Sequence, residues 1–150
     1  MGASFAETVA DRLEIADLCA RYARAIDTQD WDGLDTVFTP DAEIDYTSSG
    51  GTSGRYPEVK AWLAQVLPMF SMTQHYVTNT TVEFGPDGAS ATARSDLYNP
   101  MSLKGEDGSV RTFEVGGLYL DELVRTPDGW RIAKRVEVQL WLGGDAPTAP

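Results

Sequence analysis

The hydrophobic residues of the chain first follow a helical period. Between Ala6 and Ile26 they recur every three or four positions, which is typical of an amphipathic α-helix. The sequence therefore predicts one long helix there, with Tyr22 and Ile26 one turn apart on its inner face. The positions that define this face are Val9, Leu13, Ala16, Cys19 or Ala20, Ala23 and Ile26.

A short second helix, a strand and a polar loop are predicted next. Asp30 is placed to cap a helix within 31–38, and Pro40 lies beyond its end. Residues 42–46 alternate like a strand. The Ser- and Gly-rich segment 48–54 reads as a flexible loop, long and polar enough to act as a lid.

Beyond this loop the pattern changes from helix to strand. A third helix is predicted over 56–66, stopped near Pro68. The remaining segments alternate with a period of two and are separated by turn residues, which indicates long strands joined in hairpins. The predicted strands cover residues 72–84, 89–98, 110–125 and 130–142.

Helices followed by antiparallel strands indicate an α+β fold, with the helices packed on one face of the sheet. The pair Gly116-Gly117 lies inside a long strand, so we expect the sheet to bend there and to be curved. No linker or internal repeat interrupts residues 1–142, which are expected to form one domain. Residues 143–150 are expected to be loose.

Composition excludes several classes of protein. Of the 150 residues, 42% are hydrophobic and 23% charged, as in ordinary globular chains. No run approaches the roughly 18 apolar residues of a membrane span, and the first residues lack the features of a signal peptide. We therefore expect a cytoplasmic protein outside the membrane. The single cysteine, Cys19, leaves no internal disulfide and is expected in the core.

The charge balance argues against anionic partners. With 12 Lys and Arg against 23 Asp and Glu, the formal net charge is −11, which repels phosphate backbones and anionic lipids. No nucleic acid or membrane surface is expected as a partner. The acidic residues are spread along the chain, as they are in proteins whose charge serves solubility.

Acid-base chemistry points to one residue. His75 is the single histidine, and histidine is the side chain that exchanges protons near neutral pH. The segment 74–79 alternates like a strand, which predicts that His75 and Asn79 share one face. Asp27 is expected at the C-terminal end of the first helix, where a carboxylate opposes the helix dipole and invites a functional explanation.

Several blocks of the sequence together resemble the SnoaL-like branch of the nuclear transport factor 2-like superfamily. The resemblance extends over about residues 8–142 of the chain. It implies a cone in which a strongly curved sheet and three helices enclose a deep apolar pocket. The superfamily includes dehydratases, isomerases, hydrolases, cyclases and proteins without known catalysis, so the fold alone does not name a reaction. The blocks are residues 15–18, 21–27, 30–31, 38–42, 75–79, 116–121 and 129–132.

Within this superfamily the chain looks most like the scytalone and bile-acid dehydratases. Tyr22, Asp27, Tyr46 and His75 match positions of the dehydratase constellation, and Asp96 is placed at its last carboxylate. The second cavity histidine of scytalone dehydratase has no counterpart here, which puts that substrate in doubt.

The resemblance implies roles for these side chains. His75 would act as the base with Asp27 fixing its tautomer, while Tyr22 and Tyr46 would donate hydrogen bonds to an enolate oxygen. Neither a metal nor an organic cofactor is expected, and one histidine makes a metal site improbable.

Each of these residues also has a structural interpretation. Tyr22 would be a core residue bonded to a backbone carbonyl, and Asp27 would cap the following turn. Tyr46 would point outward after a shift of one residue in register. Asp96 would form a surface pair with Arg94, which lies on the same strand face.

A pocket lined by aromatic and methionine side chains favours a small, apolar, cyclic ligand. Asn79 is a candidate polar contact to it. The candidate apolar contacts are Trp62, Met72, Phe70, Leu97, Leu118 and Trp141, and the wider wall adds Val66, Met69, Val77 and Met101.

The leading functional prediction is a cofactor-independent lyase that dehydrates a cyclic hydroxy-carbonyl compound such as a steroid or polyketide. The alternatives are a ketosteroid-isomerase-like isomerase or a cyclase, a non-catalytic binder of apolar molecules, and the small subunit of an aromatic-ring-hydroxylating dioxygenase. Three helices cannot cover the whole sheet, so its outer face predicts a homodimer or homotrimer. The apolar residues of that prediction are Leu118, Leu120, Val136, Val138 and Leu140.

Overall fold

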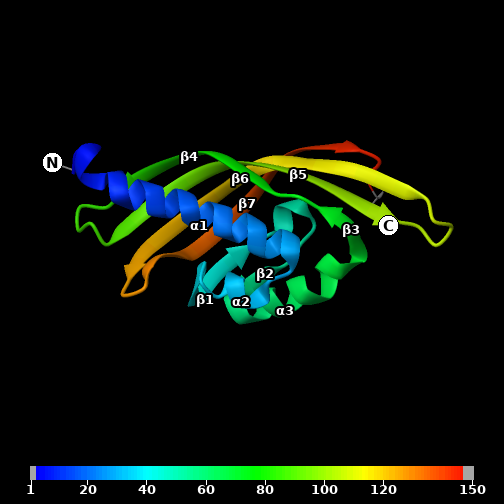
Figure 1. The fold of residues 1–150 in the computed structure, drawn as a ribbon, viewed down its shortest axis with the longest axis horizontal. Helices are drawn as coiled ribbons and strands as arrows, with labels where there is room; N and C mark the ends of the chain where they lie inside the picture. Colours follow the sequence, from blue (N-terminus) through cyan, green and yellow to red (C-terminus); the bar gives the residue numbers. More distant parts are fainter. Residues whose placement is uncertain (1–2, 147–150) are drawn as a thin grey trace.

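One strongly curved sheet organises the chain in the computed structural model, which describes residues 3–146 (Figure 1). The 7-stranded sheet has the order β2-β1-β7-β6-β5-β3, and β4 also pairs with β5. The β1–β7 pair is parallel and the other pairs are antiparallel. The strands are β1 Phe38–Asp45, β2 Ser53–Arg55, β3 Phe70–Thr73, β4 Tyr76–Phe84, β5 Ser90–Lys104, β6 Val110–Thr126 and β7 Gly129–Gly144.

The helices lie against the concave side of this sheet, which confirms the predicted α+β fold. Figure 1 shows α1 running along the sheet, with α2 and α3 gathered beside its second half. The α-helices are α1 Val9–Thr28, α2 Trp31–Leu34 and α3 Tyr56–Val66. Three short 3-10 turns accompany them: η1 Ala6–Thr8, η2 Thr47–Ser49 and η3 Leu67–Met69.

The long first helix is confirmed, but its inner face is rotated from the predicted one. Leu13 is 67% exposed and Val9 is 40% exposed, so these two side chains lie outside the core. The buried positions still follow the helical spacing, because each has another buried position three or four residues away and together they form one stripe. They are Ile15, Leu18, Cys19, Tyr22, Ala25 and Ile26.

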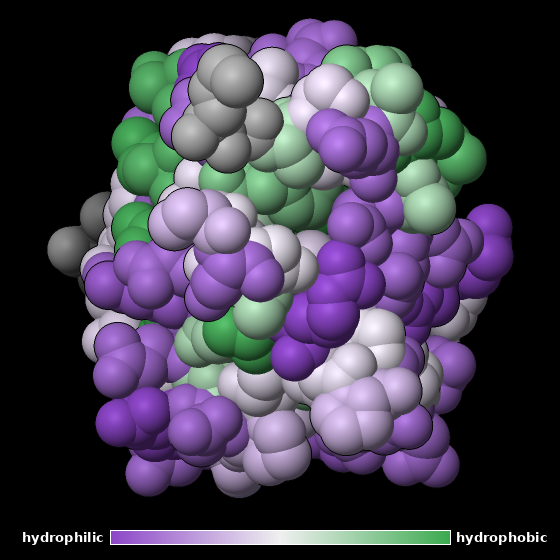
Figure 2. Space-filling model, turned by 90° about the vertical axis from the view of Figure 1, so that its left-hand side faces the viewer, coloured by the Kyte–Doolittle hydropathy of each residue, from purple (hydrophilic) through white to green (hydrophobic). Residues whose placement is uncertain are grey.

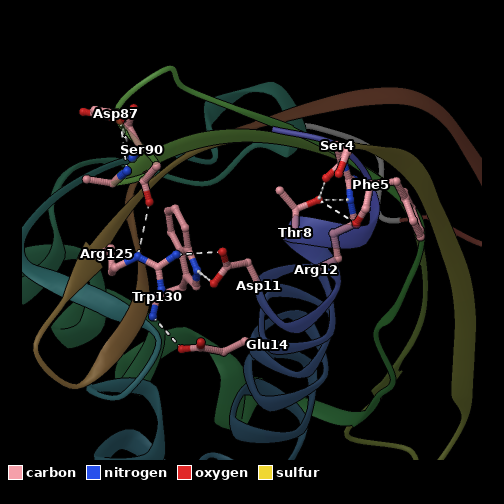
Figure 3. Close-up of polar contacts among 12 residues, drawn as sticks. Ser4, Phe5, Thr8, Asp11, Arg12, Glu14, Asp87, Ser90, Arg125 and Trp130 are labelled. Atoms are coloured by element: carbon pink, nitrogen blue, oxygen red, sulfur yellow. Dashed lines mark hydrogen bonds and ion pairs between the residues drawn. The ribbon is translucent and has the colours of Figure 1, made fainter. Parts of the chain in front are cut away.

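Polar contacts fix the first half of α1 to the β6–β7 hairpin (Figure 3). Trp130 is fully buried, and its ring Nε1 donates to Asp11 Oδ1 at 3.1 Å. Its backbone N–H donates to Glu14 at 2.7 Å, while Arg125 pairs with Asp11 at 2.7 Å. The surface at the end of the molecule where α1 begins has both hydrophilic and hydrophobic areas (Figure 2).

The region between the first two long helices contains more strand than the sequence predicts. Asp30 caps α2 as predicted, because its side chain accepts from the N–H of Gly33 at 2.9 Å. However, β1 begins at Phe38 and contains Pro40. The predicted flexible loop 48–54 is also wrong in part, since residues 53–55 form β2 and pair with β1.

The strand predicted over 72–84 is divided in two. β3 ends at Thr73 and β4 begins at Tyr76, so His75 lies in the connection rather than in a strand. The prediction that His75 and Asn79 share a strand face is therefore wrong. Asn79 has a positive φ of 52°, and the β4–β5 register shifts around it, which breaks the simple alternation.

The sheet bends where the double glycine predicts it. The pairing of β6 with β7 shifts its register between Gly116 and Gly117, and the ring of Trp141 lies so close to Gly116 that a Cβ atom would clash with it. β7 continues to Gly144, so the predicted loose tail at 143–150 begins within a strand, and its residues 147–150 lie outside the described residues.

The outer face of the sheet carries exposed aromatic residues. Tyr76, Tyr98 and Trp141 are 47%, 38% and 47% exposed, and their rings form a ladder with centroid distances of 5.8 and 6.2 Å. Leu140 is 62% exposed. The homodimer or homotrimer predicted from the sequence would use this face, and it stays a prediction.

Candidate active site

The end of α1 and the β3–β4 connection place Asp27 against His75. Asp27 Oδ2 accepts from the backbone N–H of His75 at 2.8 Å, and Oδ1 lies 2.7 Å from the ring Nδ1. A carboxylate near a helix C-terminus is disfavoured by the helix dipole, and here the contacts with the backbone N–H and the ring Nδ1 of His75 offset that cost. Asp27 thus holds the imidazole instead of capping its own turn.

Three buried tyrosine hydroxyls meet beside this pair. Tyr22 Oη lies 3.0 Å from Tyr46 Oη and 3.3 Å from Tyr119 Oη, and the ring of Tyr22 meets the imidazole of His75 edge-on at 6.2 Å. Burial raises the pKa of Tyr22, and it raises the pKa values of Tyr46 and Tyr119 further. The hydroxyls therefore stay protonated and can donate hydrogen bonds.

A buried arginine lies against two of these tyrosines. Arg135 is fully buried and forms a bidentate pair with Asp121, at 2.8 Å from Nε and 2.7 Å from Nη2. Its guanidinium carbon lies 4.1 Å from the ring centre of Tyr22 and 4.0 Å from that of Tyr119. Within residues 3–146 its Nη1 has no hydrogen-bond partner, so one donor remains free for another acceptor.

A second carboxyl group belongs to the same interior. Glu137 on β7 is 9% exposed. Burial raises the pKa of Glu137, although the Ser49 hydroxyl, His75 and Arg135 act in the opposite direction. A carboxyl group of raised pKa inside a protein is a candidate for proton exchange.

The other ring nitrogen of His75 faces β5. The carboxamide of Asn99 lies 3.1 Å from His75 Nε2, and Asn99 is only 6% exposed. Both ring nitrogens of the histidine therefore have protein partners. A substrate that reaches Nε2 has to compete with Asn99.

The structure does not bring every predicted residue into this cluster. Tyr22, Asp27, Tyr46 and His75 come together, but Asp96 lies on the outer face. There Asn79 donates to Asp96 at 2.8 Å, and Arg94 is 3.7 Å away from the same carboxylate. The strict alternation along β5 causes this, because Asn99 points inward and Asp96 therefore points outward.

The predicted apolar wall is also divided between the two faces. Leu97 is buried in the core. Trp62 and Phe70 are partly buried and pack against that core. Met72 is 39% exposed and Trp141, stacked on Tyr98, is 47% exposed. Leu118 alternates with the buried Tyr119 and faces outward. The prediction is therefore wrong for four of the expected ligand contacts, which are Asn79, Met72, Leu118 and Trp141.

Sequence reasoning missed a group of inward polar residues on the last three strands. Alternation alone could have found those on β6, because Tyr119 and Asp121 share the face of Leu123. On β7 the signal is hidden, because the β6–β7 register shifts between Glu122 and Leu123 and breaks the period. The missed residues are Asn99, Tyr119, Asp121, Arg135 and Glu137.

The arrangement combines a proton-exchanging group with hydrogen-bond donors for a developing negative charge. A histidine oriented by a carboxylate exchanges protons, and preorganised hydroxyl and guanidinium donors stabilise an oxyanion. No three His, Cys, Asp or Glu side chains among residues 3–146 are grouped as metal ligands. Over the same residues, no helix has the length and apolar character needed to cross a bilayer.

The family model described as a SnoaL-like domain matches residues 7–136. An uncharacterized protein of Mycobacterium tuberculosis (strain ATCC 25618 / H37Rv) is 47% identical over 131 residues, which is 87% of this chain and 86% of that protein. The family model and this relative therefore each match most of the chain.

Solved structures share the fold over most of the chain. A candidate aromatic ring hydroxylase from Novosphingobium aromaticivorans is 33% identical, with a TM-score of 0.77 over 91% of this chain and 94% of that one. A hexachlorocyclohexane dehydrochlorinase, LinA type 2, is 25% identical, with a TM-score of 0.79 over 98% of both chains. A candidate scytalone dehydratase from N. aromaticivorans has a TM-score of 0.80 at 18% identity over 95% and 92%, which shows the fold alone.

Proposed function

Because the chain belongs to the SnoaL-like domain family, we propose that it is a lyase that eliminates water from a cyclic hydroxy-carbonyl compound, such as a steroid or polyketide. The observation that carries the proposal is the contact of Asp27 with the backbone N–H and the ring Nδ1 of His75, beside the three tyrosine hydroxyls. A core built only for packing has no need of this set of polar groups in its interior.

Elimination next to a carbonyl group makes three demands on a site. A proton has to leave carbon, the carbonyl oxygen has to be stabilised while it gains charge, and the departing hydroxyl has to be protonated. His75, held by Asp27, exchanges the protons. Tyr22 and Tyr46 donate to the carbonyl oxygen, and the hydroxyl of Tyr119 extends this donor chain.

The buried Arg135 places a positive charge beside the tyrosine hydroxyls. Arg135 lies against the rings of Tyr22 and Tyr119, and its positive charge opposes the rise in the pKa of Tyr22 that burial causes. A tyrosine beside a cation donates a stronger hydrogen bond to an oxyanion than a neutral environment allows. Asp121 holds the guanidinium in place through two hydrogen bonds.

The dehydrochlorinase among the structural neighbours supports the class of reaction. Its name describes the loss of hydrogen chloride, which is also an elimination, and it shares 25% of residues with this chain. A proposal of elimination therefore agrees with the fold, the family and the polar interior. The same groups could shift a double bond or close a ring, and the experiment has to separate these outcomes.

Mass spectrometry of the products tests the proposal. The protein is incubated with a panel of cyclic hydroxy-ketones of steroid and polyketide type, and the products are compared with those of a buffer control. Loss of the mass of one water molecule supports dehydration. An unchanged mass with a shifted chromophore indicates isomerisation, and saturable binding without turnover indicates a binder; either result overturns the dehydratase proposal.

A further inference from the structure

The environment of the Asn99 carboxamide determines which way the group points. One of its two terminal atoms lies 3.1 Å from His75 Nε2. The other faces the backbone carbonyl oxygens of Gln74 and Pro100, at 3.1 and 3.3 Å, and the hydroxyl of Thr73 at 3.1 Å. A carbonyl oxygen only accepts hydrogen bonds, so the atom that faces Gln74 and Pro100 is the NH₂ nitrogen. The atom that faces His75 is therefore the amide oxygen.

This orientation requires a proton on His75 Nε2, because two acceptors cannot share a hydrogen bond without one. The opposite nitrogen, Nδ1, lies 2.7 Å from Asp27 Oδ1. The other oxygen of that carboxylate accepts from the backbone N–H of His75 at 2.8 Å, so both oxygens act as acceptors toward this residue. Nδ1 therefore also donates, and the ring carries a proton on each nitrogen.

We propose that Asn99 is a positioning residue that holds His75 as an imidazolium in the substrate-free protein, with Nδ1–H on Asp27 and Nε2–H on Asn99 Oδ1. The charged groups around the ring agree with this state. Asp27 faces the ring from α1, and Glu137 on β7 lies near enough for its charge to interact with His75. Arg135, which lies against the ring of Tyr22, adds a positive charge to the same interior, and its bidentate partner Asp121 offsets part of that charge.

The state of His75 decides how it meets a substrate, and this part of the inference rests on the proposed function. A substrate reaches Nε2 by replacing the Asn99 oxygen, so it must offer an acceptor such as its hydroxyl oxygen. The Nε2 proton then passes to that oxygen as the C–O bond breaks and water forms. The electron pair of the adjacent C–H bond becomes the new double bond, and the neutral ring takes the released proton, which restores the imidazolium.

Nitrogen-15 NMR at neutral pH tests the inference without any substrate. The chain has a single histidine, so the imidazole signals of a ¹⁵N-labelled sample can belong only to His75. We expect both ring nitrogens to show the shifts of protonated nitrogens, with a coupled proton on each. A neutral ring with one protonated nitrogen in the wild-type protein overturns the proposal, whatever the variants show.

Variants of Asn99 isolate its contribution. Asn99→Leu removes the acceptor, and we expect its ring to lose the Nε2 proton and become the neutral Nδ1–H tautomer. Asn99→Asp keeps an oxygen at this position, and we expect the imidazolium to persist. Ser102→Ala is the matched control, because Ser102 is a buried residue of the same strand whose hydroxyl bonds Thr112 at 2.8 Å; its ring signals should equal those of the wild type.

The outcomes separate this inference from the proposed function. An imidazolium that persists in folded Asn99→Leu shows that Asp27 suffices, and it overturns the role of Asn99. If Asn99→Leu does not fold, the comparison of wild type with Asn99→Asp still decides, because a neutral ring in either one contradicts the proposal. Failure of every hydroxy-ketone to react would overturn the dehydratase function and leave these NMR results unchanged.

Discussion

Asp27 binds His75 twice, at the backbone N–H and at the ring Nδ1, at 2.8 and 2.7 Å. The first contact fixes the β3–β4 connection to the end of α1, and the second fixes the orientation of the ring. The two side chains are 48 residues apart in the sequence, so their contact depends on the packing of α1 against the sheet. The position of the catalytic candidate is therefore tied to the fold.

Asp27→Asn should leave the fold intact and impair the reaction. The amide can still accept from the backbone N–H of His75, but it carries no charge to support a proton on the ring. We expect turnover to fall by about 10²–10⁴-fold, with an unchanged far-ultraviolet circular dichroism spectrum. Activity within a few-fold of the wild type would show that the carboxylate plays no part in proton transfer.

Tyr22→Phe should lower kcat more than it changes KM, because the lost hydroxyl acts on charge that develops during the reaction. The expected fall in kcat is about 10²–10³-fold, as for other oxyanion donors. Tyr56→Phe is the control, since the Tyr56 hydroxyl bonds Asp35 at 2.6 Å outside this cluster. An equal loss in both variants would indicate a general effect on stability, which urea unfolding would reveal.

Asp121→Asn should destabilise the protein strongly. It leaves the charge of the fully buried Arg135 without its partner, and breaking such a pair costs about 3–5 kcal/mol. Glu122→Gln, on the exposed side of the same strand, removes the 3.6 Å pair with Lys134 and should cost about 1 kcal/mol or less. The free energies of unfolding in urea check both values, and equal costs would contradict the structural role of the buried pair.

Glu137→Gln should make the protein more stable at neutral pH. Burial raises the pKa of Glu137, so the folded state binds this proton more tightly than the unfolded chain does. The free energy of unfolding therefore falls as the pH rises from the ordinary carboxyl pKa through the raised value. Glu137→Gln has no carboxyl group at this position to ionise, so it avoids this decrease in the free energy of unfolding. Urea unfolding at mildly acidic and neutral pH should show a smaller decrease for Glu137→Gln than for the wild type or Glu122→Gln.

The exposed aromatic ladder on the outer sheet face should lie in a contact between subunits. The sequence predicts a homodimer or homotrimer from the apolar residues of this face, which are Leu118, Leu120, Val136, Val138 and Leu140. The exposed rings of Tyr76, Tyr98 and Trp141 add to that apolar surface. Trp141→Ser should weaken the association, and sedimentation equilibrium measures it. A wild-type protein that sediments at the mass of one chain contradicts the prediction.

The sequence predicts the elements of this fold better than it predicts which way their side chains face. The bounds of α3, the cap at Asp30 and the bend at Gly116-Gly117 follow from local signals, and the structure has them. Local signals also predict α1, but the rotation of its inner face depends on how the helix packs on the sheet. Leu13 is apolar and correctly spaced, yet it is 67% exposed.

The candidate site shows the same division. Tyr22, Asp27, Tyr46 and His75 could be named because their spacing resembles a known constellation. The prediction that Asp96 belongs to the site is wrong, because β5 alternates strictly and its inward position is that of Asn99. Arg135 could not be found from sequence, because the shifted register of β7 hides its inward direction until the β6–β7 pairing is known.

The rate of water loss in His75→Ala tests the central claim most directly. Once mass spectrometry has identified a hydroxy-ketone substrate, kcat/KM is compared among wild type, His75→Ala and Asp96→Asn, the last of which alters a carboxylate on the outer face. The account predicts a fall of about 10²–10⁴-fold for His75→Ala and wild-type activity for Asp96→Asn. Full turnover by His75→Ala would contradict it.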